Sequence, residues 1–254
     1  MEFEIEGTLK YAKSNYQLTI SEPIHIANDV ADDKGKVIAI MGENGSGKTT
    51  LIRAILGDPA VEFDGKVSLT SGGKNARVVF MPQDVAAAEG PLAMRDYIGF
   101  QDWMERIVEE LGIPLAATTN EVSSGTLKKA QILKMLYSEG DMYVLDEPTT
   151  YIDRATKRTI ANIVNDRVKM GKWFFISGNE PDFLGEVATD IIYMILTPEN
   201  RATANFIAIK PRPPMIDLRK AARDTCRHLT QYDYKKQRVK MKPTGPGSEE
   251  PDVV

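Results

Sequence analysis

The segment Gly42–Thr49, GENGSGKT, has the residue types and spacing of a phosphate-binding loop, G-x-x-x-x-G-K-[ST]. Its glycines allow successive backbone N–H groups to converge on phosphate oxygens. Lys48 supplies a compact cation for the β- and γ-phosphates, and the Thr49 hydroxyl can bind Mg²⁺. The pattern therefore predicts a site for a nucleoside triphosphate with Mg²⁺. The expected ligand-binding residues of this segment and its edge are Gly42, Asn44, Gly45, Ser46, Gly47, Lys48, Thr49 and Thr50.

The elements on either side of this segment must position it. Val37–Met41 is a continuous apolar run, typical of a strand buried on both faces of a parallel sheet. Thr49–Leu56 is expected to be a helix that ends at Gly57, with its positive N-terminal end against the phosphates. A flexible surface loop is the plainer alternative for the glycine-rich segment, but this strand–loop–helix context disfavours it.

A second candidate for chemistry is the acidic pair Asp146-Glu147, which follows the apolar run Met142–Leu145. A strand that ends beside the phosphates is where Mg²⁺ and an attacking water must lie. We expect Asp146 to hold the Mg²⁺ shell and Glu147 to polarise water towards the γ-phosphate. A solvated turn is the alternative interpretation of two adjacent acids.

The rest of the chain alternates between strand and helix patterns, which favours an α/β fold with an open, mostly parallel sheet. Alternating or continuous apolar residues predict short strands within Phe3–Ile26 and further strands at Arg77–Met81, Trp173–Ile176, Ile191–Leu196 and Phe206–Ile209. Helical spacing predicts helices over Met94–Leu111, from Ser123 to about Tyr137, and over Arg154–Met170.

In order and spacing, these segments resemble the ATP-binding-cassette (ABC) ATPases over roughly residues 16–184. Met41–Leu51 is similar to the Walker A segment of that family, and Tyr143–Pro148 to its Walker B segment with the catalytic glutamate. Gln83, 35 residues after Lys48, resembles the Q-loop glutamine that touches Mg²⁺ and senses a partner. Val122–Thr126 stands where the signature loop is expected, and Thr150–Asp153 resembles the D-loop.

The resemblance implies a P-loop NTPase with an N-terminal antiparallel β subdomain and a short inserted helical lobe at about 84–140, all within a domain spanning 1–210. It implies ATP and Mg²⁺ as ligands, with Thr49, Gln83 and Asp146 around the metal, and Lys48, Gln83, Glu147 and Asn179 as catalytic residues. It also implies a homodimer or heterodimer of such subunits. Tyr16 is a candidate to stack on adenine, Tyr11 is its competitor, and an ordinary strand residue is the alternative for either.

In the family, the signature loop meets the γ-phosphate held by the other subunit. Ser123, Ser124 and Gly125 would offer hydroxyl and N–H donors at the start of a helix, which suits an anion. Asp153 of the D-loop joins this set of nucleotide-binding candidates. The alternative is a simple N-cap, with Ser123 or Ser124 capping the helix.

Three departures from the family pattern bear on function. The signature is usually LSGGQ but is VSSGT here, so Ser124 adds a side chain where phosphate must approach closely. The switch histidine is missing, and Asn179 or Gly178 occupies its place, which predicts slow hydrolysis because asparagine carries no charge. Ser123 follows Gln83 by only 40 positions, a trimmed lobe that weakens the case for docking on a membrane subunit.

Composition limits the remaining possibilities. The net charge is −4, so the chain as a whole is not a polycation built for nucleic acid, and a single cysteine excludes an intramolecular disulfide. Met1–Gly7 lacks the pattern of a secretory signal, no apolar run approaches bilayer length, and we expect a cytoplasmic protein, peripheral on the inner membrane face.

The C-terminal part differs in charge from the rest. Residues 212–242 hold ten Lys and Arg against three acids, within a basic segment that we place at 211–242. That segment could contact nucleic acid or an anionic surface, or could be a solvated helix packed on the protein's own acidic core. We expect a disordered tail at 243–254.

Three hypotheses for function follow. The first is the ATPase subunit of an ABC transporter, which drives a separate membrane permease by ATP-dependent dimerisation. The second is a soluble ABC ATPase that acts as an ATP-gated clamp on nucleic acid, the ribosome or an assembly complex. The third is a regulatory ATP-binding protein with little turnover, suggested by the missing histidine.

Overall fold

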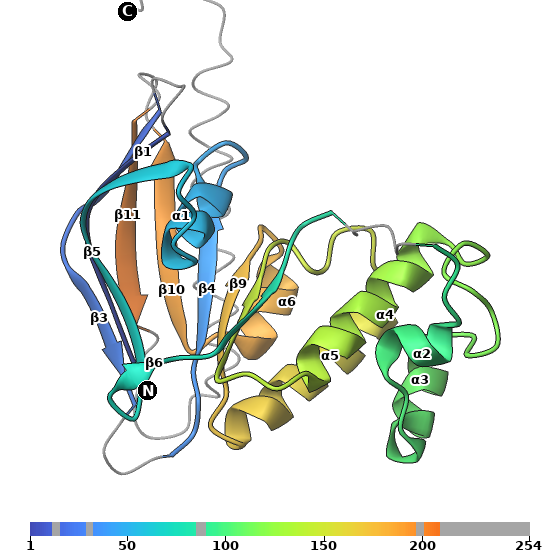
Figure 1. The fold of residues 1–254 in the computed structure, drawn as a ribbon. Coiled ribbons are helices and arrows are strands. Elements are labelled where there is room, and N and C mark those ends of the chain that lie inside the picture. The colour runs from blue at the N-terminus through green and yellow to red at the C-terminus, as the bar shows by residue number, and fades with distance from the viewer. Residues whose placement is uncertain (12–15, 29–32, 85–89, 197–200, 209–254) are drawn as a thin grey trace, which may run out of the picture.

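The computed structural model describes residues 1–11, 16–28, 33–84, 90–196 and 201–208. Its strands form one mixed sheet in the order β6-β5-β1-β2-β11-β10-β4-β9-β8-β7, with β3 paired to β1 (Figure 1). The strand bounds are β1 Glu2–Tyr11, β2 Gln17–Ile20, β3 Ile24–Ala27, β4 Val37–Gly42, β5 Val61–Ser71, β6 Lys74–Asn75, β7 Val78–Met81, β8 Met142–Leu145, β9 Trp173–Ser177, β10 Asp190–Leu196 and β11 Arg201–Ala208.

The sheet has a parallel half and an antiparallel half, as the sequence predicted. β10, β4, β9, β8 and β7 run parallel to their neighbours within that group. β1 pairs antiparallel with β2, β3 and β5 in the N-terminal part. The carboxyl ends of β4 and β8 therefore lie at the same edge of the sheet, separated only by β9, and this edge is where the predicted site residues follow the strands.

The central parallel strands bury both faces, and each face belongs to a different hydrophobic core. In β4, Val37, Ala39 and Met41 pack into one core, whereas Ile38 and Ile40 pack into the other. The first core is shared with the helices α3 (Glu105–Leu111), α4 (Ser124–Tyr137) and α5 (Arg154–Lys169), and the second with α1 (Lys48–Ile55) and the antiparallel strands. This explains why the Val37–Met41 pattern is continuous rather than alternating.

Helices cover the sheet in two groups. α1, Lys48–Ile55, contacts β1, β4 and β5 and lies between the two halves of the sheet (Figure 1). The second group lies on the other face: α2 Met94–Ile98, a 3-10 helix η1 Asp102–Met104, α3 Glu105–Leu111, α4 Ser124–Tyr137, α5 Arg154–Lys169 and α6 Pro181–Val187. α2, η1, α3 and α4 fall within the stretch predicted as an inserted helical lobe.

The prediction of one helix over Met94–Leu111 is wrong. α2 ends at Gly99, which adopts a left-handed φ of 64°, and helical structure begins again at the 3-10 helix η1. Trp103, within this stretch, is 62% exposed and meets the Tyr137 ring edge-on. A glycine that caps one short helix and begins a turn explains the break.

The sequence patterns did not predict β5 or α6. β5 contains Asp64-Gly65 at its centre and is largely exposed on one side, so its apolar signal is weak. α6 has seven residues, shorter than a helical pattern can establish. The strand expected at Phe206–Ile209 is β11, which begins earlier, at Arg201. The predicted basic segment 211–242 and tail 243–254 lie outside the described residues.

Candidate nucleotide-binding site

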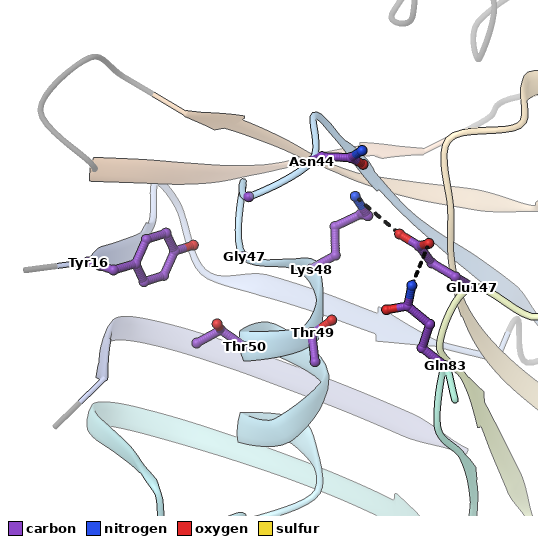
Figure 2. Close-up of a pocket in the computed structure, with 9 residues that line it drawn as sticks. Tyr16, Asn44, Gly47, Lys48, Thr49, Thr50, Gln83 and Glu147 are labelled. Carbon is purple, nitrogen blue, oxygen red and sulfur yellow. Dashed lines mark hydrogen bonds and ion pairs between the residues drawn. The ribbon is translucent and has the colours of Figure 1, made fainter. Parts of the chain in front are cut away.

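The segment Gly42–Thr49 borders a cavity of about 520 Å³ at the carboxyl edge of the parallel strands (Figure 2). Four separate parts of the chain face it. The predicted phosphate loop therefore lies beside Glu147 of the acidic pair. Its lining residues are Tyr16, Asn44, Gly45, Gly47, Lys48, Thr49, Thr50, Gln83 and Glu147.

Tyr16, which immediately precedes β2, lies directly against the loop. Its hydroxyl donates a hydrogen bond of 2.6 Å to the Ser46 carbonyl, and burial raises the pKa of the phenol well above its usual range. Gly47 has φ +95°, and a Cβ there would lie 1.6 Å from the Tyr16 hydroxyl, so only glycine fits. The competing candidate, Tyr11, ends β1, and its side chain lies outside the described part of the structure.

Lys48 is the first residue of α1 and only 6% exposed. Its ammonium donates to the Gly42 carbonyl at 3.0 Å and to the Glu43 carbonyl at 3.3 Å. It also lies 3.7 Å from Glu147 Oε1, so loop and acidic pair are in electrostatic contact (Figure 2). A buried ammonium beside the loop is suited to bind phosphate, because burial strengthens its attraction to negative charge.

Asp146, 2% exposed, joins the strand end to the loop. Its Oδ2 accepts a 2.9 Å hydrogen bond from the Thr49 hydroxyl, and its Oδ1 accepts a 2.5 Å bond from the Ser177 hydroxyl. Ser177 also accepts a 2.9 Å bond from the Glu147 N–H. Ser177, at the end of β9, therefore orients both acidic residues, and the sequence patterns gave it no role.

Glu147 has a left-handed backbone, with φ 47°, which is unusual for a residue other than glycine. Such strain persists where the surrounding structure fixes it, and it often marks a functional site. The carboxylate faces the cavity, and Oε2 accepts a 3.3 Å hydrogen bond from Gln83 Nε2 (Figure 2). Lys48, Gln83 and Glu147 therefore form one polar cluster.

Asn179 lies at the same edge, two residues beyond the end of β9. Its side-chain amide is within hydrogen-bonding distance, 3.0 Å, of the Asn44 side chain in the loop. The position expected for a switch histidine thus holds an exposed neutral amide beside the phosphate loop.

Ser123, Ser124 and Gly125 do not line this cavity. Ser123 Oγ accepts a 3.1 Å hydrogen bond from the Thr126 N–H and caps α4, so the structure contains the N-cap that was the alternative interpretation. Ser124 and Gly125 line a neighbouring cavity of about 390 Å³ that Gln83 also borders.

Asp153 likewise lies away from the cavity that the loop borders. It caps α5, accepting hydrogen bonds from the Thr156 N–H at 2.9 Å and the Thr156 hydroxyl at 2.7 Å. These bonds, the N–H first, hold the pKa of its carboxyl far below the usual range. Lys129 forms an ion pair with it at 3.2 Å.

The residues present fit Mg²⁺ bound with a triphosphate. The Thr49 hydroxyl and the Asp146 carboxylate are already in contact, and these oxygen groups are of the kind that Mg²⁺ binds. The described residues contain no group of three or more His, Cys, Asp or Glu that could hold a metal alone. A metal that takes its remaining ligands from phosphates and water needs no such cluster.

The family model described as ABC transporter matches residues 29–150, which contain the phosphate loop, Gln83 and the acidic pair. The chain is 26% identical over 200 residues to the zinc transport system ATP-binding protein AdcC of Streptococcus pneumoniae, covering 68% of this chain and 84% of that protein. It is 30% identical over 152 residues to the aliphatic sulfonates import ATP-binding protein SsuB 2 of Burkholderia cenocepacia, covering 53% of this chain and 54% of that protein.

Solved structures support the same fold. An archaeal ribosome recycling factor, aABCE1, superposes with a TM-score of 0.65 at 22% identity, covering 79% of this chain and 38% of that one. An ATP-binding subunit of an ABC transporter superposes with a TM-score of 0.62 at 17% identity, covering 82% of this chain and 90% of that one. No helix in the described ranges is long and apolar enough to cross a membrane. With its phosphate loop and acidic strand end at one edge of the sheet, the chain has the fold of the ABC-type ATPases and is similar to them in sequence over residues 29–150.

Proposed function

We propose that the cavity beside Gly42–Thr49 binds ATP with Mg²⁺ and hydrolyses it to ADP and phosphate. The observation that carries the proposal is the 2.9 Å contact between the Thr49 hydroxyl and Asp146 Oδ2, which joins loop and acidic strand end at one point. Lys48 and Glu147, the chain neighbours of Thr49 and Asp146, are themselves 3.7 Å apart. Phosphate binding and water activation can therefore occur at the same place.

Each residue has a distinct role in this proposal. The loop amides and Lys48 bind the triphosphate and neutralise its charge, while Thr49 and Asp146 hold Mg²⁺. The metal, when bound, stabilises negative charge on the phosphate oxygens. Glu147 polarises the attacking water and accepts its proton, and Gln83 fixes the direction of the Glu147 carboxylate.

Asn179 sets the expected rate. It lies beside the loop through Asn44 but carries neither a proton to transfer nor a positive charge. The loss of one charge-assisted contact to a transition state costs about 2.7–4 kcal/mol, or roughly 10²–10³ in rate. We therefore expect turnover slower than that of an ABC ATPase with histidine at this position.

For the biological role, we propose an ATPase subunit that works as a dimer with a separate membrane permease. Two relatives support this choice, since one is a zinc transport system ATP-binding protein and the other an aliphatic sulfonates import ATP-binding protein. Ser124 and Gly125, which border the second cavity rather than the first, would meet the nucleotide of the other subunit. No contact in the described ranges favours the alternative, a soluble ATP-gated clamp on nucleic acid.

Lys48→Ala and Glu147→Gln test the proposed activity. Lys48→Ala should weaken ATP binding at least tenfold, because it removes a buried cation from the phosphate site. Glu147→Gln should keep ATP affinity within about threefold but lower kcat by at least 10², because it removes the proton acceptor. ATP affinity is measured by calorimetry and turnover by phosphate release.

The matched control is Lys74→Ala, which changes an exposed lysine on β6 that does not line the cavity. It should behave as the unmodified protein does. If Lys48→Ala bound ATP as tightly as this control, the cavity would not be the nucleotide site, and the proposed function would be wrong.

A further inference from the structure

Lys128 is a buried lysine in α4 to which the proposed reaction gives no role. It is 5% exposed, and its ammonium donates to the Gln83 carbonyl at 2.5 Å and to the Pro82 carbonyl at 3.4 Å. Burying an ammonium costs free energy unless hydrogen-bond partners replace water, and here two backbone carbonyls do so. The contact therefore fixes the segment that carries Gln83 against the side of α4.

The charges around Lys128 belong to the reaction site. Burial lowers the pKa of the ammonium, while the carboxylates of Asp84, Asp146 and Glu147 act in the opposite direction. The ammonium is thus within electrostatic reach of both acidic residues of the strand end.

Gln83 connects Lys128 to Glu147. Lys128 holds the backbone of Gln83, and the Gln83 side chain donates to Glu147 Oε2. Gln83 lines both cavities, the first with Glu147 and the second with Lys128 and Ser124. Since residues four apart lie on one face of a helix, Ser124 and Lys128 face the second cavity together.

We propose that Lys128 is a positioning residue that sets the contact between Gln83 and Glu147 and couples it to the signature segment Ser123–Gly125. A shift of the first turn of α4 carries Lys128 with it, because the helix moves as a rigid rod. The Gln83 backbone follows the ammonium, and the Glu147 carboxylate loses or gains its hydrogen bond. The inference rests on the proposed ATPase activity and adds a residue to it.

Lys128→Met tests the role, because methionine keeps most of the side-chain length but removes the charge and the donors. We expect kcat to fall about tenfold with the KM for ATP within about twofold, since Lys128 does not line the first cavity. Lys128→Arg, which keeps a charged donor, should restore kcat to within about threefold of the unmodified protein. The control is Lys134→Met, an exposed lysine of α4 that lies over the Tyr97 ring, and it should change neither parameter.

A double-mutant cycle with Gln83→Ala separates positioning from general support of the fold. If Lys128 acts through Gln83, Lys128→Met should lower kcat less than twofold in the Gln83→Ala background. An equal loss in both backgrounds would overturn the proposal, as would a Lys128→Met protein with unmodified kcat. If Lys128→Met does not fold, Lys128→Gln, which has a shorter donor, enters the same cycle with the same expectation.

Hydrogen exchange gives a readout that needs no turnover. In the protein without nucleotide, Lys128→Met should speed amide exchange at residues 80–84, whereas Lys134→Met should not. Unchanged exchange there would refute the positioning of Gln83 by Lys128, even if ATP hydrolysis is present. A protein that exchanges as expected but does not hydrolyse ATP would instead count against the proposed function and not against the contact between Lys128 and Gln83.

Discussion

At the scale of single residues, the site depends on one hydroxyl that the sequence patterns did not single out. Ser177 donates to Asp146 and accepts from the Glu147 backbone, so it fixes both acids of the strand end. A serine after an apolar strand looks like any turn residue. Only the parallel pairing of β8 and β9, with Leu145 opposite Ile176, brings it beside Asp146.

Ser177→Ala should lower kcat roughly ten- to a hundredfold, because a hydrogen bond to a charged group contributes about 1.5–3 kcal/mol. ATP affinity should fall less, since the phosphate loop is unchanged. Steady-state phosphate release against ATP concentration separates the two effects. Ser138→Ala, which removes a hydroxyl that donates to the Met135 carbonyl away from the cavity, is the control, and equal kcat in the two variants would contradict this role for Ser177.

Other site residues could be predicted because their chemistry is local. The spacing of Gly42, Lys48 and Thr49 specifies a phosphate loop without knowledge of the fold. The Gln83–Glu147 contact and the burial of Lys128 depend on packing between distant segments, which no spacing in one sequence reveals.

At the scale of elements, capping side chains stabilise the ends of helices. Asp153 caps α5 through Thr156, and its lowered pKa means that the native state favours the charged carboxylate. A group with a depressed folded-state pKa stabilises the protein above the ordinary aspartate pKa, about 3.9. That stabilisation is lost as the pH falls through the folded-state value.

Asp153→Ala should therefore lower the free energy of unfolding by about 1 kcal/mol at pH 7, the usual value of an N-cap. The difference from the unmodified protein should shrink below about pH 4, where the Asp153 carboxylate of the unfolded chain takes up a proton. Urea unfolding at pH 7 and pH 3 measures both. Asp153→Asn keeps an acceptor without the charge and should lose less at pH 7, and a pH-independent difference for Asp153→Ala would argue against the charged cap.

Element types follow the strength of the local pattern. The buried strands β4, β8 and β9 are predicted by continuous apolar runs, and α5 by its amphipathic spacing. The sequence patterns do not predict β5, because its outer residues are polar. They do not predict the break at Gly99, because the apolar spacing continues across it. Tertiary packing decides such elements, and local propensity does not.

At the scale of the whole molecule, the proposed ATP-dependent dimer explains why Ser124 and Gly125 lie outside the first cavity. A nucleotide bound at the phosphate loop of one copy would be completed by the α4 N-terminus of the other. The order of the strands, with the antiparallel half joined to β10 through β11, needs long-range pairing that no local pattern in the sequence fixes.

Glu147→Gln with Mg²⁺ and ATP should sediment as a dimer, and without nucleotide as a monomer, because hydrolysis no longer removes the bridging phosphate. Ser124→Arg, which places a bulky side chain at the proposed junction, should stay monomeric under both conditions. Sedimentation velocity measures the change. A nucleotide-independent monomer would contradict dimerisation, while ATP-dependent binding of the Glu147→Gln protein to RNA or DNA, and not to membranes of its source, would favour the clamp.

The double burial of β4 has a consequence for the loop that follows it. Val37, Ala39 and Met41 belong to one interior and Ile38 and Ile40 to the other. Sliding this strand by a single residue would exchange the two sets and misplace every side chain in both. Gly42, its last residue, pairs with Met194 of β10 and is thereby fixed at the carboxyl edge of the sheet, so the loop starts from the same anchor point whichever nucleotide arrives.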